Sequence, residues 1–136
     1  MALTVRDLKE DDYDTILVGW WKQWGWEAPE RDFLPEDGVG GIMVMDDDVP
    51  VCAGFCYFAN SKVAWVDWII SNKEYRKKPE RSHAIKLLVY YLTEACKALG
   101  YKYSYALIKN RNLLSTYESL GYTRGDSYTS EMIKKL

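Results

Sequence analysis

Three short apolar runs joined by tight turns precede one long run with a different hydrophobic period, and this change of period constrains the fold most. The three runs cover residues 42–45, 51–58 and 63–71, and the turns between them contain Asp, Pro, Asn and Ser. Such runs predict an antiparallel meander of three strands. Between residues 82 and 99 the apolar side chains recur every three or four positions, which predicts a buried helix that Gly100 ends.

Further elements are predicted on both sides of this unit. They are a strand near residues 3–8, a helix over 13–24, a strand over 103–108, a helix over 112–120 that Asn112 caps, and a strand over 127–133. This order predicts an α/β (α+β) fold, with a mixed, mostly antiparallel central sheet of about six strands and helices on both faces. Because the long helix crosses over between the strands before and after it, those two strands should be parallel.

Size and charge narrow the class of protein. The chain has 136 residues, which fits a single domain over residues 1–136. It carries 18 basic and 20 acidic residues, whereas a nucleic-acid-binding protein normally has a basic excess, so nucleic acid is a disfavoured partner. The longest uncharged run, residues 49–61, is too short for a membrane helix, so we expect no membrane partner.

The cysteine pattern indicates a reducing compartment. The chain has three cysteines, Cys52, Cys56 and Cys96, and an odd number argues against a disulfide scaffold. If Cys52 and Cys56 share a strand, they lie about 13 Å apart, which is too far for a disulfide. A zinc site needs about four ligands, and His83 is the single histidine. The sequence therefore predicts a cytoplasmic protein with reduced, buried thiols and no metal site.

A basic turn precedes the long helix and is the first candidate site. Five positive charges fall within eleven residues there, namely Arg76, Lys77, Lys78, Arg81 and Lys86. The helix dipole favours anions at a helix N-terminus, so basic side chains at this end point to an anionic ligand. Together with free backbone N–H groups they predict a phosphate site, and the alternative is a solvated basic loop.

Asp67 is the second candidate, because it interrupts an otherwise apolar strand. Alternation along residues 63–71 puts Asp67 on the same face as Trp65 and Ile69. A carboxylate in such a place must be paired, solvated by a cleft, or have a raised pKa. It is therefore either a site residue or a satisfied structural partner of an arginine or a backbone amide.

Tyr117 is the third candidate, and it lies on the helix predicted for residues 112–120. It shares a helical face with Leu113 and Leu120, which is typical of a core aromatic residue. A tyrosine hydroxyl that faces a cleft can instead donate a proton to a leaving group. The sequence leaves both interpretations open.

The chain resembles the Gcn5-related N-acetyltransferases (GNATs) in the order of its elements over essentially its whole length. The resemblance is sharpest in the late motif of that superfamily, where Asn110 is followed by Tyr117 and then by Gly121-Tyr122. Residues 71–88 are similar to its acyl-CoA motif, with a Glu-Tyr-Arg stretch and then Leu-Leu in the following helix.

The acyl-CoA loop departs from the family pattern, which is usually Arg/Gln-x-x-Gly-x-Gly/Ala. Here the loop is longer by about three residues, and Ser82 and Ala84 stand where glycines would be. Either Arg76 or a residue nearer Arg81 could therefore contact the phosphates.

The resemblance implies an enzyme that moves an acetyl group from acetyl-CoA to an amine by direct attack. It implies that Tyr117 protonates the departing CoA thiolate, and that Asp67, directly or through water, helps to remove the proton of the amine. The implied acyl-CoA contacts are Ile69, Ile70, Ser71, Arg76, Lys77, Arg81, Ser82, His83, Ala84 and Asn110. The alternative function is a non-catalytic CoA-binding or protein-interaction module with the same fold.

In this superfamily the first helix and the loop after it usually form the acceptor side. Here that stretch holds Trp20, Trp24 and Trp26 together with several carboxylates, which would suit a cationic amine of a small molecule or a protein. The alternative is that the tryptophans pack the helix onto the sheet and that the acids are solvated. The acceptor amine stays open, and a homodimer is one option for the assembly.

Overall fold

A computed structural model describes residues 2–75 and 78–136, and the five strands of this part of the chain form one sheet. The strands follow one another across the sheet in sequence order: β1 (Leu3–Asp7), β2 (Gly41–Asp46), β3 (Val49–Phe58), β4 (Val63–Ser71) and β5 (Tyr103–Tyr105). Pairing is antiparallel from β1 to β4 and parallel between β4 and β5. The predicted mixed, mostly antiparallel sheet and the predicted parallel pair are confirmed.

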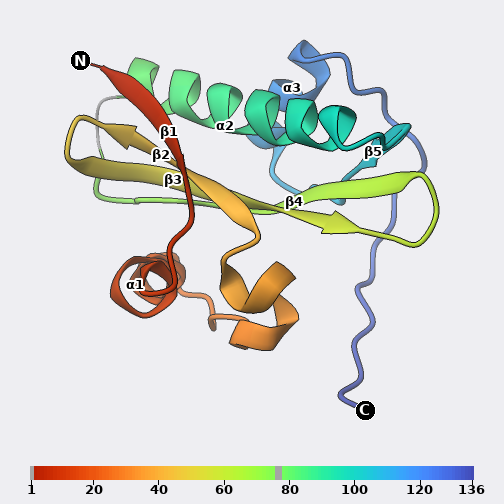
Figure 1. Ribbon diagram of the computed structural model, residues 1–136, viewed down its shortest axis with the longest axis horizontal. Coiled ribbons are helices and arrows are strands. Elements are labelled where there is room, and N and C mark those ends of the chain that lie inside the picture. Colours follow the sequence, from red (N-terminus) through yellow and green to blue (C-terminus); the bar gives the residue numbers. More distant parts are fainter. Residues whose placement is uncertain (1, 76–77) are drawn as a thin grey trace.

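Helices cover both faces of the sheet, as predicted (Figure 1). One face carries α2 (Lys78–Ala98) and α3 (Arg111–Ser119). The other face carries a π-helical turn (Tyr13–Leu17) that continues into α1 (Val18–Gln23), followed by two short 3₁₀ helices (Arg31–Phe33 and Pro35–Gly38). Each layer has its own apolar core: Leu88 of α2 and Val66 of β4 are fully buried in one, and Leu17 of the π-helical turn and Phe55 of β3 are fully buried in the other. Within the described residues, no helix has the length and apolar character that crossing a bilayer requires.

Several predicted elements differ from the structure, including β5, which ends at Tyr105 and not at Ile108. α2 begins at Lys78, four residues before the predicted start, because Pro79 in the first turn lacks only an N–H that the helix does not need. α3 is capped by Asn110, whose Oδ1 accepts from Leu113 N at 3.0 Å, and not by Asn112. The strand predicted over residues 127–133 is absent from the described chain, which leaves five strands where about six were expected.

A bulge in β4 sets which side chains point to which face. The register between β3 and β4 shifts opposite Trp68, which has φ +57°, and Gly54 on β3 lies at this shift. A Cβ on Gly54 would stand 2.5 Å from Ile69 Cδ1 and 2.9 Å from Leu92 Cδ1, so a larger residue here would require these side chains to shift. Ile69 consequently packs on the α2 side and Trp68 on the α1 side, and the predicted common face of Asp67 and Ile69 is wrong.

β4 and β5 form a fork. Their parallel pairing covers only Val63 to Trp65 on β4 and Tyr103 to Tyr105 on β5. Beyond these residues the two strands part, so β4 continues from Val66 to Ser71 without β5 beside it. This fork is the feature of the fold that positions the candidate site.

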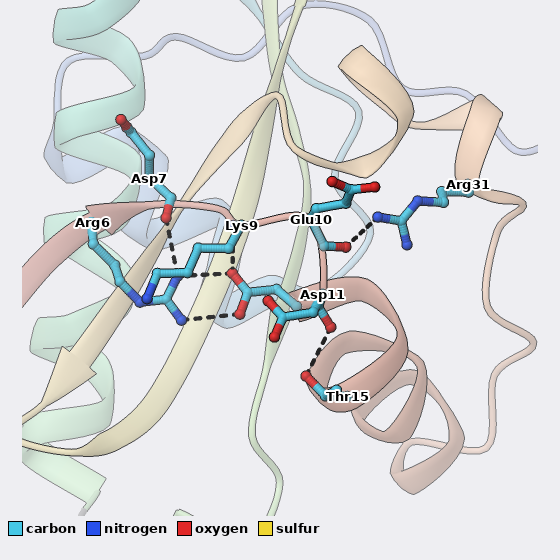
Figure 2. A network of polar contacts seen from close by, with 8 residues as sticks. Arg6, Asp7, Lys9, Glu10, Asp11, Thr15 and Arg31 are labelled. Carbon is cyan, nitrogen blue, oxygen red and sulfur yellow. Dashed lines mark hydrogen bonds and ion pairs between the residues drawn. The ribbon is translucent and has the colours of Figure 1, made fainter.

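The N-terminal strand is joined to the first helical turn by a partly buried ion pair. Arg6 donates to both carboxylate oxygens of Asp12, at 2.8 and 3.1 Å, and Lys9 N donates to the same carboxylate at 2.7 Å. Figure 2 shows this network, together with the bonds from Arg31 to the Glu10 carbonyl and from Thr15 to the Asp11 carbonyl. The contacts fix the turn that leads from β1 into the first helical turn.

Candidate active site

The carboxylate of Asp67 bridges the fork. Its Oδ2 accepts a hydrogen bond from Leu107 N at 3.0 Å, and its Oδ1 accepts one from Trp68 N at 2.8 Å. Leu107 follows β5, so the first bond spans the two arms of the fork, while the second helps to hold the bulge. Asp67 lies on the α1 face of the sheet, since it pairs with the buried Phe55 of β3.

Burial raises the pKa of Asp67 above its ordinary value, while the two backbone hydrogen bonds oppose this rise and the negative charge of Glu131 adds to it. Among the described residues, no basic side chain forms an ion pair with Asp67. The sequence offered a site residue or a satisfied partner of backbone amides as alternatives. The structure shows Asp67 as a partner of two backbone amides, and its role as a site residue stays a prediction.

Tyr117 reaches the same fork from α3. Its side chain is buried, and its hydroxyl donates to Val66 O at 2.7 Å, one residue before Asp67. Its ring packs edge-to-face against Tyr122, with the centroids 4.9 Å apart. Burial raises the pKa of Tyr117, with the nearby Asp67 charge as a smaller cause, so the hydroxyl stays protonated. Tyr117 is thus a core aromatic residue whose hydroxyl lies at the fork.

An aromatic wall that the sequence did not reveal lies on the α1 face beside Asp67. The Trp68 ring is edge-to-face with Phe33, at 5.1 Å between centroids, and with Trp21, at 6.5 Å. Tyr57 belongs to the same face, donates to Phe33 O at 3.3 Å, and has a pKa raised by burial and by Asp67. Strict alternation would have put Trp68 on the opposite face, and nothing in the sequence pairs Phe33 with it.

The predicted donor contacts gather where β4 ends and α2 begins. Arg81 Nη2 donates to Ser71 Oγ at 3.4 Å, so two of these residues are in contact. Ser71 O accepts a hydrogen bond from the indole Nε1 of Trp24 at 2.8 Å. Arg76 and Lys77, which are also predicted contacts, lie outside the described residues.

The earlier start of α2 changes what the predicted phosphate loop can offer. Only the N–H groups of the first turn of a helix lack acceptors one turn back. Ser82, His83 and Ala84 lie beyond that turn, so their N–H groups bond within the helix. The expectation that these N–H groups are free for a phosphate is therefore wrong. The side chains of Ser82 and His83 are exposed, while Ala84 is fully buried.

The remaining predicted acyl-CoA contacts differ in which of their atoms could reach a ligand. Ile70 is buried in the core on the α1 side and Ile69 packs on the α2 side, so only their backbone could meet a ligand, as the prediction requires. Asn110 uses its side-chain oxygen to cap α3. Its Nδ2 makes no hydrogen bond within the described part of the chain and can donate to a ligand.

The three tryptophans predicted for the acceptor side occupy different environments. Trp20 is only 4% exposed and packs beneath the sheet, which fits the packing alternative. Trp24 is half-buried against Ser71 and Arg81, and Trp26 stacks on Trp24 with 56% of its surface exposed. Trp24 therefore contacts residues that were predicted to bind the acetyl donor, whereas Trp68 lies next to Asp67.

Comparison with known proteins identifies the fold. The sequence matches no model of a protein family. It matches no curated protein either. The structure superposes on the ribosomal-protein-S18-alanine N-acetyltransferase from Escherichia coli with a TM-score of 0.72 and 14% sequence identity, covering 92% of this chain and 80% of that chain. It also superposes on the glucosamine-6-phosphate N-acetyltransferase from Arabidopsis thaliana, with a TM-score of 0.68, 14% identity, and coverage of 98% and 100%.

A third similar structure is AAC(6')-Iy in complex with the bisubstrate analogue CoA-S-monomethyl-acetylneamine. Its TM-score is 0.68 at 13% identity, with 99% of this chain and 100% of that chain covered. The chain has the GNAT fold. The predicted resemblance is thereby confirmed at the level of the fold.

Proposed function

We propose that the chain is an N-acetyltransferase that takes acetyl-CoA as the donor and an amine as the acceptor. The observation that carries this proposal is the convergence at the fork. There the Asp67 carboxylate and the Tyr117 hydroxyl bond to the backbone of β4 on the two sides of residue 67, with the hydroxyl on Val66 O and the carboxylate on Trp68 N. An acid and a base at one fork fit a reaction that must remove one proton and supply another.

Asp67 acts as the proton acceptor for the incoming amine. A free amine is mostly ammonium at neutral pH, so it must lose a proton before it attacks. The raised pKa of Asp67 makes this carboxylate a better base than an ordinary aspartate, and it receives the proton directly or through water. The lone pair of the nitrogen then forms the bond to the thioester carbonyl carbon.

Tyr117 acts as the proton donor to the leaving group. When the tetrahedral intermediate collapses, the carbon–sulfur bond breaks and the thiolate leaves with the electron pair. The hydroxyl of Tyr117, protonated because its burial raises its pKa, turns from Val66 O to the thiolate and gives up its proton. The nitrogen of the intermediate still carries two protons and loses one of them to water, so the products are the amide and the CoA thiol. Solvent then takes the proton held by Asp67 and returns one to Tyr117.

The alternative, a CoA-binding or protein-interaction module without catalysis, has one observation in its favour. Asp67 already occupies both Trp68 N and Leu107 N, and Tyr117 already occupies Val66 O. If the fork has only a structural role, its backbone N–H and C=O groups should likewise be hydrogen-bonded to side chains of the same chain. The two functions differ in whether the fork opens to a thioester.

The test is acetyl transfer from acetyl-CoA to a panel of amines. We would include spermidine, a lysine peptide, an alanyl peptide, glucosamine-6-phosphate and neamine, and measure both thiol release and the mass of the acetylated product. At about 100 times its Kd, acetyl-CoA should also stabilise the fold by about 2.7 kcal/mol in thermal unfolding.

Transfer to one amine class together with this stabilisation supports the proposal. Stabilisation by acetyl-CoA with no transfer to any amine or to a cell extract would replace it with the binding module. Absence of both effects would contradict both functions.

A further inference from the structure

Trp24 is the meeting point of two basic side chains from other elements. The guanidinium carbon of Arg81 lies 5.3 Å from the centroid of the Trp24 ring, and Lys73 Nζ lies 5.2 Å from it. Neither cation forms an ion pair with an acid in the part of the chain that the structure describes. The indole stabilises each cation, but the two positive charges repel each other, so an anion between or beside them would be favoured.

This cluster is held in place before any ligand arrives. Trp24 Nε1 donates to Ser71 O at 2.8 Å, Arg81 donates to Ser71 Oγ, and Lys73 Nζ donates to Gln23 O at 3.4 Å. These bonds join the end of α1 to the end of β4 and to the first turns of α2. A prearranged set of donors loses less conformational entropy when it binds a ligand.

Trp26 extends the cluster with an open aromatic surface. Its ring is stacked on Trp24 with 5.8 Å between centroids and an interplanar angle of 18°, and 56% of the residue is exposed. One face of the indole therefore rests on Trp24, and solvent reaches the rest. A flat exposed ring beside unpaired cations has the two properties that bind nucleotides, which are a stacking surface for the base and positive charge for the phosphates.

We propose that Trp24, Trp26, Lys73 and Arg81 bind the nucleotide end of the donor coenzyme, with the adenine stacked on Trp26 and the phosphates held by the two cations. The proposal rests on the proposed function, because it takes CoA as the donor. It moves Trp24 and Trp26 from the acceptor side, where the sequence predicts them, to the donor side, where their contacts are. Recognition of the acceptor then falls to other residues, including Trp68 beside Asp67.

The test compares three probes on one set of proteins. CoA, adenosine 3′,5′-bisphosphate and pantetheine are titrated by calorimetry and by tryptophan fluorescence into the wild type, Trp26→Ala and Tyr90→Ala. Tyr90 is the matched control, since it is an aromatic residue on α2 that is 46% exposed and has no contact with the cluster. Because both side chains are exposed, neither substitution should disturb folding.

The proposal predicts that Trp26→Ala weakens CoA and the bisphosphate about tenfold and leaves pantetheine unchanged. It also predicts that the bisphosphate quenches the fluorescence of the wild type. Lys73→Gln should weaken the bisphosphate and reduce the salt dependence of its binding. Tyr90→Ala should bind all three probes as the wild type does.

Two contrary results have different meanings. If the wild type binds CoA and Trp26→Ala binds it equally well, the nucleotide site is wrong while the proposed function stands. If the wild type binds no CoA at all, the nucleotide site and the proposed function both fall.

Discussion

Asp12 is a buried carboxylate held by a charged partner, whereas Asp67 is a partly buried carboxylate held by neutral partners. Asp12 is 3% exposed and accepts two hydrogen bonds from Arg6 and one from Lys9 N, in the network of Figure 2. Burial by itself raises the pKa of Asp12, but these hydrogen bonds and the Arg6 charge outweigh it, so the pKa is lowered. Asp67 accepts only from two neutral backbone amides, and burial leaves its pKa raised.

The difference shows how one residue type serves two purposes. A carboxylate that is held by a guanidinium keeps its charge and has little tendency to take up a proton. A carboxylate that is held by neutral amides keeps its position and, when burial raises its pKa, takes up a proton more readily than an ordinary aspartate. We therefore propose that Asp12 serves stability and that Asp67 serves chemistry.

The largest expected effect concerns transfer at Asp67. Asp67→Asn keeps an oxygen that can accept from a backbone amide but removes the base, so kcat/KM for the amine found in the panel should fall about a hundredfold or more. Asp12→Asn, measured per folded molecule, should transfer acetyl at the wild-type rate. Equal activity of Asp67→Asn and the wild type would remove Asp67 from the mechanism.

The second effect concerns stability at Asp12. Asp12→Ala leaves the partly buried Arg6 and Lys9 N without their acceptor, so the free energy of unfolding should fall by about 2 kcal/mol. Asp67→Asn should change it by less than about 1 kcal/mol, since no cation loses a partner. Urea unfolding measures the free energy of unfolding of both variants. Similar losses in the two would show that Asp12 and Asp67 do not differ in their contribution to stability.

The third effect separates the two tyrosines that pack on each other near the fork. Tyr117→Phe should lower turnover by about tenfold, a modest loss because a thiol with a pKa of about 8.5 leaves fairly well without a proton. Tyr122→Phe is the control, because it removes a hydroxyl that bonds Thr93 and Ser104 instead of Val66 O. Equal losses in both variants would indicate that packing, and not proton donation, is what matters.

The smallest effect is the pH dependence of stability, and its sign differs between the two acids. The contribution of Asp12 is present above the ordinary aspartate pKa of about 3.9 and is lost as the pH falls through its lowered native pKa. The contribution of protonated Asp67 is present below about 3.9 and is lost as the pH rises through its raised native pKa.

Urea unfolding of the wild type, Asp12→Asn and Asp67→Asn over a series of pH values tests this sign. On acidification the wild type should lose stability relative to Asp12→Asn and gain it relative to Asp67→Asn. Differences of the same sign for both variants would show that the surroundings of the two carboxylates do not set their titration.

The hydrophobic period was enough to predict the sheet type and the order of the strands and main helices up to α3. Gly100 does end its helix region, and the crossover by α2 does make β4 and β5 parallel. The start of α2 was missed because Pro79 is as compatible with a first helical turn as with a loop. A last strand was wrongly predicted because residues 127–133 have strand-like composition, whereas a strand exists only where it finds a partner.

Candidate site residues could be named from the sequence only where a residue type was out of place or where it belonged to a family motif. Asp67 stands out as an acid in an apolar strand, and Tyr117 stands out in the late motif. The bulge at Trp68 depends on the register with β3, the amide of Leu107 is brought to Asp67 by the fork, and Trp24 is brought to Ser71 by tertiary packing. None of these three contacts has a local sequence signal.

The most direct test of the account is a carbon-detected NMR titration of the side-chain carboxyl groups, which reads Asp12 and Asp67 in one sample without a substrate. The account predicts that Asp67 titrates above the ordinary aspartate value of about 3.9 and Asp12 below it. Equal pKa values, or the reverse order, would contradict the assignment of Asp67 to chemistry and Asp12 to stability.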